Sequence, residues 1–157
     1  MKALRRLALA LSAVLAGASA HAADVAGVSA REIVVGHVSD LSGPIAMLGT
    51  PVRDGMLMRF DEANAAGGVH GRMLRLVVED AGYDPKRGVL AARKLVQRDK
   101  AFAFIATMGT PVVMATMPMV LDAGRLHLFP FSPHEATYTP LHPLKFQVFA
   151  PYQDYME

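Results

Sequence analysis

Blocks of apolar residues at two different spacings follow one another along the chain. Residues 33–38 are almost uninterruptedly apolar and rich in β-branched side chains, which is typical of a strand buried on both faces. In residues 50–68, Val52, Met56 and Phe60 recur at helical spacing, and charged side chains fill the other side. This part of the chain therefore predicts a strand followed by an amphipathic helix that ends at a pair of glycines.

The same order of elements is repeated further along. Residues 73–79 predict a second strand. The turn after it ends in Asp84, which can cap a helix, and Pro85, which suits the first helical position. The helix that follows is predicted to run from residue 85 to about residue 99.

The second half of the chain predicts three more strands and one more helix. The strands are expected at residues 101–108, 125–131 and 145–150, and the helix begins at Pro111. Pro118, inside that helix, is predicted to kink or split it. Strands that alternate with helices at this spacing favour an α/β fold, with an open parallel sheet and helices on both of its faces.

Three turns of this fold have the composition expected of a binding edge. In an open parallel sheet, ligands bind beyond the carboxyl ends of the strands. The turns that leave those ends are DLSGPIAMLGT at residues 40–50, TMGTP at 107–111 and FPFSP at 129–133. Each combines small residues, prolines and hydroxyl groups, which suits backbone N–H groups that bind a small ligand.

The TMGTP turn suits a carboxylate or another small anion. If Pro111 is the first helical residue, Thr110 can offer its hydroxyl group. Val112 and Val113 can offer unpaired amides at the positive end of the helix dipole. The alternative is that Thr110 only caps the helix, and Ser132, after the fourth strand, has the same two interpretations.

The amino terminus has the pattern of a secretory signal peptide. MKALRR is basic, the next stretch is apolar but too short for a comfortable membrane span, and ASAHA carries alanines in the A-x-A pattern. We therefore expect residues 1–22 to be a signal peptide that is cleaved after Ala22. The mature domain then begins at residue 23, and its expected location is the periplasm.

Charge and cysteine content exclude several classes of function. Residues 1–22 hold three of the 16 basic residues, so 13 basic residues remain against 14 acidic ones. A nearly neutral domain has no basic face for nucleic acid or for an anionic membrane surface. The absence of cysteine excludes a disulfide framework and thiol chemistry. No later segment is apolar enough to insert into a membrane.

The sequence carries no catalytic, cofactor or metal motif. It has no G-x-G-x-x-G turn, no P-loop and no G-x-S-x-G elbow. The histidines lack compact ligand spacing, so neither a metal nor a cofactor is expected, and His37 and His127 are expected to be core or sheet-end residues. Asp80, Tyr83 and Asp84 are assigned to a turn and a helix cap rather than to acid–base chemistry. We therefore expect a binding protein, not an enzyme.

Several motifs together resemble one protein family over essentially the whole mature chain. LSGPIAMLG, then NAAGGVHGR before an apolar strand, then EDAGYDP before a helix ending KLVQRD resemble the periplasmic solute-binding proteins of the leucine/isoleucine/valine-binding type. Those proteins are receptors for ABC importers. The resemblance implies a Rossmann-like, type I periplasmic binding lobe over residues 23–144. It also implies a small-molecule ligand, such as an amino acid or a related small carboxylate, and an ABC permease as partner.

The resemblance assigns ligand contacts to four residues. By position in the family, Leu48 touches the ligand side chain and Thr110 holds the ligand carboxylate. Phe131 and Ser132 supply main-chain groups and a hydroxyl. Core packing beneath the loop is the alternative for Leu48 and its apolar neighbours. The sequence Gly109-Thr110-Pro111 stands where the branched-chain amino acid binders have a serine-rich turn. An amino acid, an amide, and an aromatic or aliphatic acid therefore all remain open as ligands.

The resemblance also implies that a second lobe is missing. Family members have two lobes that close on the ligand about a hinge, and residues 145–157 correspond to the start of the crossover between them. We therefore expect a truncated chain of poor stability, with millimolar binding or none, because half a cleft leaves polar contacts in water. The alternatives are a ligand-sensing module of a signalling system and an inactive gene fragment.

Overall fold

The computed structural model describes residues 25–156, so the predicted signal peptide lies outside the described residues. These residues form one parallel sheet with the strand order β2-β1-β3-β4-β5. The strands are β1 Glu32–Ser39, β2 Met73–Asp80, β3 Ala103–Ile105, β4 Leu126–Leu128 and β5 Lys145–Phe146. The predicted α/β class and parallel sheet are confirmed.

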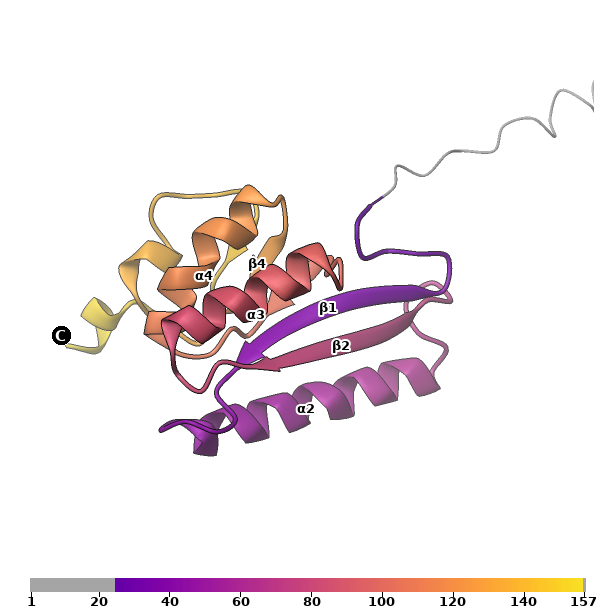
Figure 1. Ribbon diagram of the computed structural model, residues 1–157, viewed down its shortest axis with the longest axis horizontal. Coiled ribbons are helices and arrows are strands. Elements are labelled where there is room, and N and C mark those ends of the chain that lie inside the picture. The colour runs from indigo at the N-terminus through magenta and orange to yellow at the C-terminus, as the bar shows by residue number, and fades with distance from the viewer. Residues whose placement is uncertain (1–24, 157) are drawn as a thin grey trace, which may run out of the picture.

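Helices cover both faces of the sheet, as the sequence predicts (Figure 1). Helix α2, Ala46–Ala65, lies on one face, whereas α3, Pro85–Gln97, and α4, Thr110–Asp122, lie together on the other. Two short 3-10 helices, Glu135–Thr137 and Tyr152–Tyr155, follow in the last part of the chain. The chain leaves β1 towards β2 on one side and returns to β3 on the other side of β1, which creates a topological switch point at the carboxyl ends of β1 and β3.

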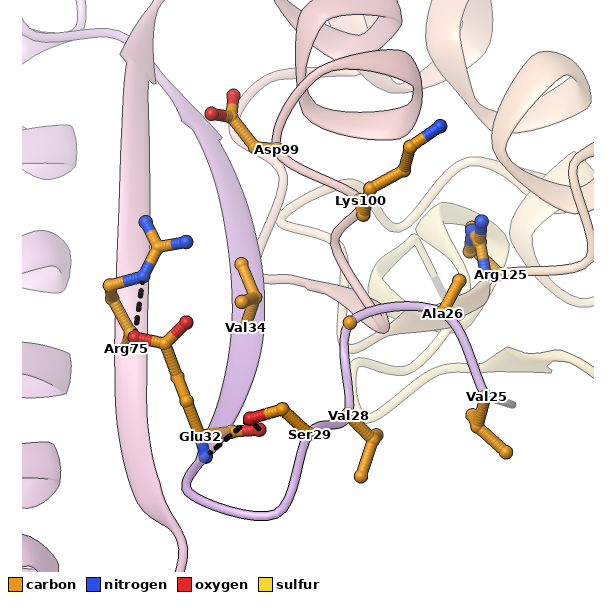
Figure 2. Close-up of a pocket in the computed structure, with 11 residues that line it drawn as sticks. Val25, Ala26, Val28, Ser29, Glu32, Val34, Arg75, Asp99, Lys100 and Arg125 are labelled. Atoms are coloured by element: carbon orange, nitrogen blue, oxygen red, sulfur yellow. Dashed lines mark hydrogen bonds and ion pairs between the residues drawn. The ribbon is translucent and has the colours of Figure 1, made fainter. Parts of the chain in front are cut away.

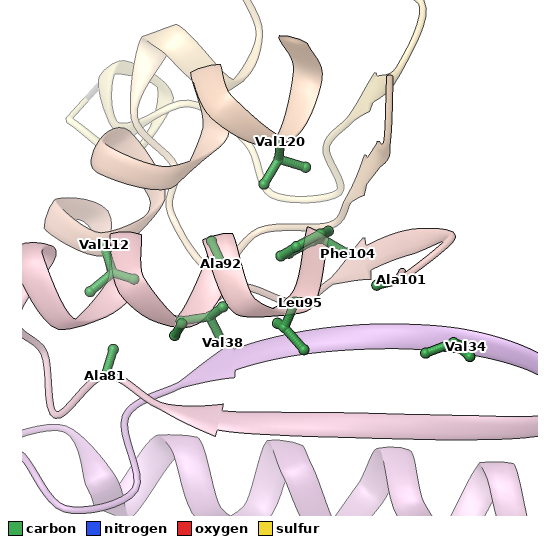
Figure 3. Packing of buried hydrophobic residues seen from close by; sticks show 10 residues of the cluster. Val34, Val38, Ala81, Ala92, Leu95, Ala101, Phe104, Val112 and Val120 are labelled. Carbon is green, nitrogen blue, oxygen red and sulfur yellow. The ribbon is translucent and has the colours of Figure 1, made fainter. Parts of the chain in front are cut away.

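The hydrophobic core lies between the sheet and the pair α3 and α4 (Figure 3). Val38 on β1, Leu95 on α3 and Phe104 on β3 have no exposed surface. The two helices approach closely at Gly88, where a Cβ atom would lie 2.8 Å from Val112 Cγ1. Helix α2 is different, because Gly49 is its only fully buried residue. The face under α3 and α4 therefore supplies most of the burial that stabilises the fold.

Helix α2 begins earlier than the sequence predicts. It starts at Ala46, whereas the apolar spacing of the sequence places the helix in residues 50–68. The amide groups of Leu48 and Gly49 both donate to Ile45 O, at 2.8 and 3.1 Å. These bonds form the first helical turn ahead of Pro51, so the second part of the expected turn, residues 46–50, is helical.

Strands β3, β4 and β5 are shorter than predicted. The backbone turns sharply after β3 and again after β4. Ala106 follows β3 with φ 55°, and Phe129 follows β4 with φ 53°, a conformation that interrupts a strand. Met108 and Phe131 nevertheless form an isolated parallel bridge beyond these points. The two irregular segments therefore stay side by side at the carboxyl edge.

The predicted cap of α3 is confirmed, whereas a predicted break in α4 is not found. Asp84 caps α3 as predicted, and one of its carboxylate oxygens accepts hydrogen bonds from the amides of Lys86 and Arg87 at 2.7 and 3.0 Å. Helix α4 runs through Pro118, so of the two effects predicted for this proline, a kink or a split, the split is wrong.

Two histidines are buried in the sheet, as the sequence predicts. His37 Nδ1 lies 3.0 Å from Ile105 O, while neither ring nitrogen of His127 has a hydrogen-bond partner within residues 25–156. Burial lowers the pKa of each imidazole from 6.5 to about 4. The positive charge of Lys145 also lowers the pKa of His127, and that of Arg53 also lowers the pKa of His37. Both side chains are therefore neutral in the folded protein near pH 7.

Acid should destabilise the fold through these histidines. The unfolded chain binds a proton on each imidazole below about pH 6.5 and the folded chain only below about pH 4, so stability is greatest above pH 6.5 and falls between those values. The loss is about 3 kcal/mol for His127. Urea unfolding from pH 7.5 to pH 4 should show this slope, and His127→Leu should reduce it. His70→Asn, which removes an exposed histidine, is the control. An unchanged slope in His127→Leu would contradict the account.

Substitution of two helical glycines by alanine should have opposite effects on the free energy of unfolding. A Cβ atom at Gly55 meets nothing within 4 Å, so Gly55→Ala should raise the free energy of unfolding by about 0.5–1 kcal/mol. Gly88→Ala should lower it by about 1–3 kcal/mol, because the β-branched side chain of Val112 cannot easily move away. Thermal or urea denaturation of the pair measures the difference. Equal stabilisation by both substitutions would show that α3 and α4 are not closely packed.

Candidate ligand site

Three turns meet at the carboxyl edge of β1, β2 and β3. The first follows β1 at residues 40–45, the second follows β2 at residues 80–84, and the third follows β3 at residues 106–109. The first two touch where a Cβ atom at Gly43 would lie 2.6 Å from Gly82 O. The second and third touch where a Cβ atom at Gly109 would lie 2.5 Å from Tyr83 Cε2 and 3.4 Å from Ile45 Cδ1. Glycine is therefore required where the turns pack against one another, and the turns form one continuous surface at the switch point.

Asp40 holds the first turn in shape. Its side chain has no exposed surface, and its two carboxylate oxygens accept hydrogen bonds from Gly43 N at 2.6 Å and Ile45 N at 2.8 Å. The start of α2 packs directly onto this residue, because a Cβ atom at Gly49 would lie 1.9 Å from Asp40 O. A buried carboxylate with two amide donors fixes the path of the turn that leads into α2.

Asp80 joins the first turn to the second. One of its carboxylate oxygens accepts from Leu41 N and Gly82 N, both at 2.9 Å, and the other accepts from Ser42 Oγ at 2.5 Å. Arg87 pairs with the second oxygen at 3.1 Å. Desolvation raises the pKa of Asp80, but these hydrogen bonds and the charge of Arg87 outweigh it, and the pKa falls to about 2. Asp80 is therefore a structural anion rather than a proton donor.

Helix α4 begins differently from the prediction. Gly109, with φ 87°, is the N-cap residue, and Thr110 is the first helical residue. Thr110 is therefore not the cap residue, and its hydroxyl bonds to Ser132 and Tyr152, so the interpretation that Thr110 only caps the helix is wrong. Val113 N is also not free, because it donates to Gly109 O at 2.9 Å, and Val112 is fully buried. The donors that an anion can reach at this helix start are therefore those of Thr110.

A chain of hydroxyl groups passes through Thr110. Ser132 Oγ donates to Thr110 Oγ1 at 3.0 Å, and Thr110 Oγ1 lies 3.2 Å from the hydroxyl oxygen of Tyr152. Ser132 is fully buried, so it supports Thr110 from beneath. The structure thus brings together two of the four predicted contact residues, Thr110 and Ser132.

The other two predicted residues lie nearby on separate elements. Phe131 precedes Ser132 and packs edge-on against Phe149, with ring centroids 5.0 Å apart. Leu48 lies in the first turn of α2 and is 52% exposed, so core packing beneath the loop does not explain it. The side chain of the first turn that lies beside Gly109 is Ile45, three residues before Leu48.

Sequence reasoning missed three residues at this edge. Tyr83 packs on Gly109, and Tyr152 bonds to Thr110. Gln147 Nε2 donates to Ser132 O at 2.8 Å and to Thr137 Oγ1 at 2.9 Å, which ties the β5 segment to the Ser132 loop. The only sequence signal was a tyrosine in a turn otherwise made of small and acidic residues, AGYDP.

A separate hollow of about 510 Å³ lies at the opposite, amino edge of the sheet. Figure 2 shows its lining, which includes the ion pair between Arg75 Nε and Glu32 Oε2 at 2.9 Å. Asp99, Lys100 and Arg125 add further charged groups to its lining. None of the predicted ligand contacts lies there.

The part of the chain that the structure describes contains neither a membrane-crossing helix nor a metal cluster. Within residues 25–156, no helix combines the length and apolar content that crossing a membrane requires. In the same residues, no three histidine, aspartate or glutamate side chains gather closely enough to bind a metal ion.

Comparison with known proteins identifies relatives over most of the chain. The periplasmic binding protein family model matches residues 32–156. An amino acid binding protein of Pseudomonas aeruginosa is 31% identical over 126 residues, which cover 80% of this chain and 32% of the relative. A Leu/Ile/Val-binding protein homolog of Brucella melitensis is 36% identical over 118 residues, which cover 75% of this chain and 27% of the relative.

Solved structures agree with the sequence matches. A substrate-binding periplasmic protein from Ralstonia solanacearum superposes with a TM-score of 0.73 at 29% identity and covers 78% of this chain and 35% of its own. A fatty acid ABC transporter substrate-binding protein from Thermomonospora curvata has a TM-score of 0.68 at 27% identity and covers 81% of this chain and 31% of its own. This chain spans about a third of the length of these relatives. The chain belongs to the periplasmic binding protein family and carries part of the type I fold.

Proposed function

We propose that residues 23–144 are the amino-terminal ligand-binding lobe of an extracytoplasmic substrate-binding protein that serves an ABC importer. The ligand is an amino acid or a similar small carboxylate or amide. Residues 145–157 are the start of a crossover to a second lobe, residues 1–22 are a signal peptide, and the working location is the periplasm. The names of the relatives, which include amino acid and Leu/Ile/Val-binding proteins, support this proposal.

The observation that carries the proposal is the placement of Thr110. Its hydroxyl and its amide lie at the positive end of α4, at the switch point where three turns meet. Ser132 donates a hydrogen bond to Thr110 Oγ1, which leaves the hydroxyl hydrogen of Thr110 to bond outwards, to Tyr152 or to a ligand oxygen. In the structure that outer position is taken by the phenol oxygen of Tyr152, which a carboxylate oxygen would replace or join.

Apolar side chains at the carboxyl edge suit the rest of a small organic acid. Ile45 lies beside Gly109, and Leu48 exposes half of its surface in the first turn of α2. Phe131, which precedes Ser132, forms an aromatic pair with Phe149. A ligand whose carboxylate binds Thr110 would bury its apolar part against these side chains, which is the usual arrangement of a small-molecule site.

Affinity for a ligand should be low in this chain alone. Thr110 is half-buried and not enclosed, so each hydrogen bond to the ligand competes with water. We expect dissociation constants in the millimolar range for L-leucine and related acids. Calorimetry that finds micromolar affinity would contradict the view that half of the cleft is absent.

Thr110→Val should weaken binding selectively. An amide chemical-shift titration of the isotope-labelled chain with L-leucine should show about a 3- to 10-fold higher dissociation constant, because one hydrogen bond to a charged group is lost in a wet site. Thr139→Val, which changes an exposed loop threonine, is the matched control and should bind as the unaltered chain does. If Thr110→Val binds as tightly as the control, the carboxylate does not bind at Thr110.

A further inference from the structure

Tyr83 adopts a backbone conformation that its residue type rarely tolerates. It has φ 61° and follows Gly82, which has φ 55°. The turn is held there by two hydrogen bonds, from Gly82 N to Asp80 Oδ1 at 2.9 Å and from Asp84 N to Ala81 O at 3.0 Å. Glycine or asparagine would suit this position better, and strained residues of this kind gather at ligand sites. The side chain of Tyr83 is therefore expected to have a role that offsets the strain of its backbone.

The ring of Tyr83 and the glycine at position 109 are matched in size. A Cβ atom at Gly109 would lie 2.5 Å from Tyr83 Cε2 and 2.9 Å from Cδ2. No side chain at position 109 can coexist with the ring in this place, so the tyrosine fills the space that a residue at 109 would otherwise occupy. Because Gly109 directly precedes Thr110, the edge of the ring lies beside the proposed carboxylate anchor.

Other aromatic side chains gather around the same anchor. Tyr152 reaches Thr110 from the last described segment through its hydroxyl group. Phe131 packs against Phe149 at an interplanar angle of 67°, next to Ser132. With Tyr83, three separate stretches of chain bring aromatic rings to the neighbourhood of one hydroxyl group. A ligand held by its carboxylate at Thr110 would therefore have aromatic neighbours.

We propose that Tyr83 determines the specificity of the site, and that it selects carboxylates attached to a planar aromatic ring over saturated carboxylates of the same size. This inference rests on the proposed function, because it takes Thr110 as the carboxylate anchor. An aromatic ligand meets the edge or face of the tyrosine ring with complementary partial charges, which a saturated ring does not have. The expected preference is about 2- to 10-fold in dissociation constant.

Benzoate and cyclohexanecarboxylate form a matched pair of probes, since they carry the same charge and the same number of carbon atoms. Each should be titrated into the isotope-labelled chain, with the Thr110 amide signal as the reporter. The unaltered chain should bind benzoate more tightly. Tyr83→Phe keeps the ring and should keep the preference, whereas Tyr83→Gly should bind both probes equally. Tyr83→Gly also relieves the strained backbone, so a folded variant is expected, and its amide spectrum away from the turn checks this.

The outcomes separate this inference from the proposed function. Binding of both probes at Thr110 without a preference for benzoate, or with a preference that persists in Tyr83→Gly, overturns the role of Tyr83 and leaves the carboxylate site intact. A Thr110 amide signal that neither probe shifts overturns the proposed function and the role of Tyr83 with it. Equal binding in Tyr83→Phe would mean that the phenol hydroxyl, not the ring, carries the preference, which also overturns the inference.

Discussion

The carboxyl edge of this protein depends on two carboxylates that accept hydrogen bonds from the backbone of its turns. Asp40 accepts hydrogen bonds from the amides of Gly43 and Ile45. Asp80 accepts hydrogen bonds from the amides of Leu41 and Gly82. Without these acceptors, the partly buried amides would lose their partners, at a cost of up to about 1–3 kcal/mol each. The low pKa of Asp80 reflects the same bonds. The path of the first turn, the start of α2 and the contact of the first turn with the second all follow from them.

The arrangement of the strands places this edge where a ligand can bind. Because β2 and β3 lie on opposite sides of β1, the helices that follow β1 and β3 start on opposite faces of the sheet and leave their turns facing each other. Glycines at the contacts let the turns approach, and Thr110 lies where they meet. The support of Thr110 by Ser132 then depends on the irregular stretches after β3 and β4, which the bridge between Met108 and Phe131 holds together.

Local sequence patterns predicted those parts of the fold that local chemistry determines. The apolar run at residues 33–38 became β1, and the Asp84 cap with Pro85 opened α3 as expected. The apolar spacing from Val52 onwards missed the first turn of α2, because the bonds that start this helix depend on a turn fixed by Asp40. The ends of β3 and β4 were also missed, since the positive φ angles of Ala106 and Phe129 arise from tertiary contacts and leave no composition signal.

The candidate site was predictable only in part, for the same reason. The resemblance to a family indicated Thr110 and Ser132, and the structure joins them by a hydrogen bond. Tyr83 and Tyr152 come from other stretches of the chain and reach Thr110 or its neighbour only in the folded state. The available amides were overestimated, because the sequence could not show that α4 begins at Thr110 and that Val113 N bonds to Gly109 O.

A crystal structure of the chain grown with a high concentration of L-leucine would test the central claim most directly. The account predicts the ligand carboxylate within hydrogen-bond distance of Thr110 at the carboxyl edge, with the hydroxyl of Tyr152 displaced or shared. Leucine bound instead in the hollow at the amino edge, beside Arg75 and Arg125, would contradict it. So would a structure in which Thr110 keeps its bond to Tyr152 and no ligand is bound at the switch point.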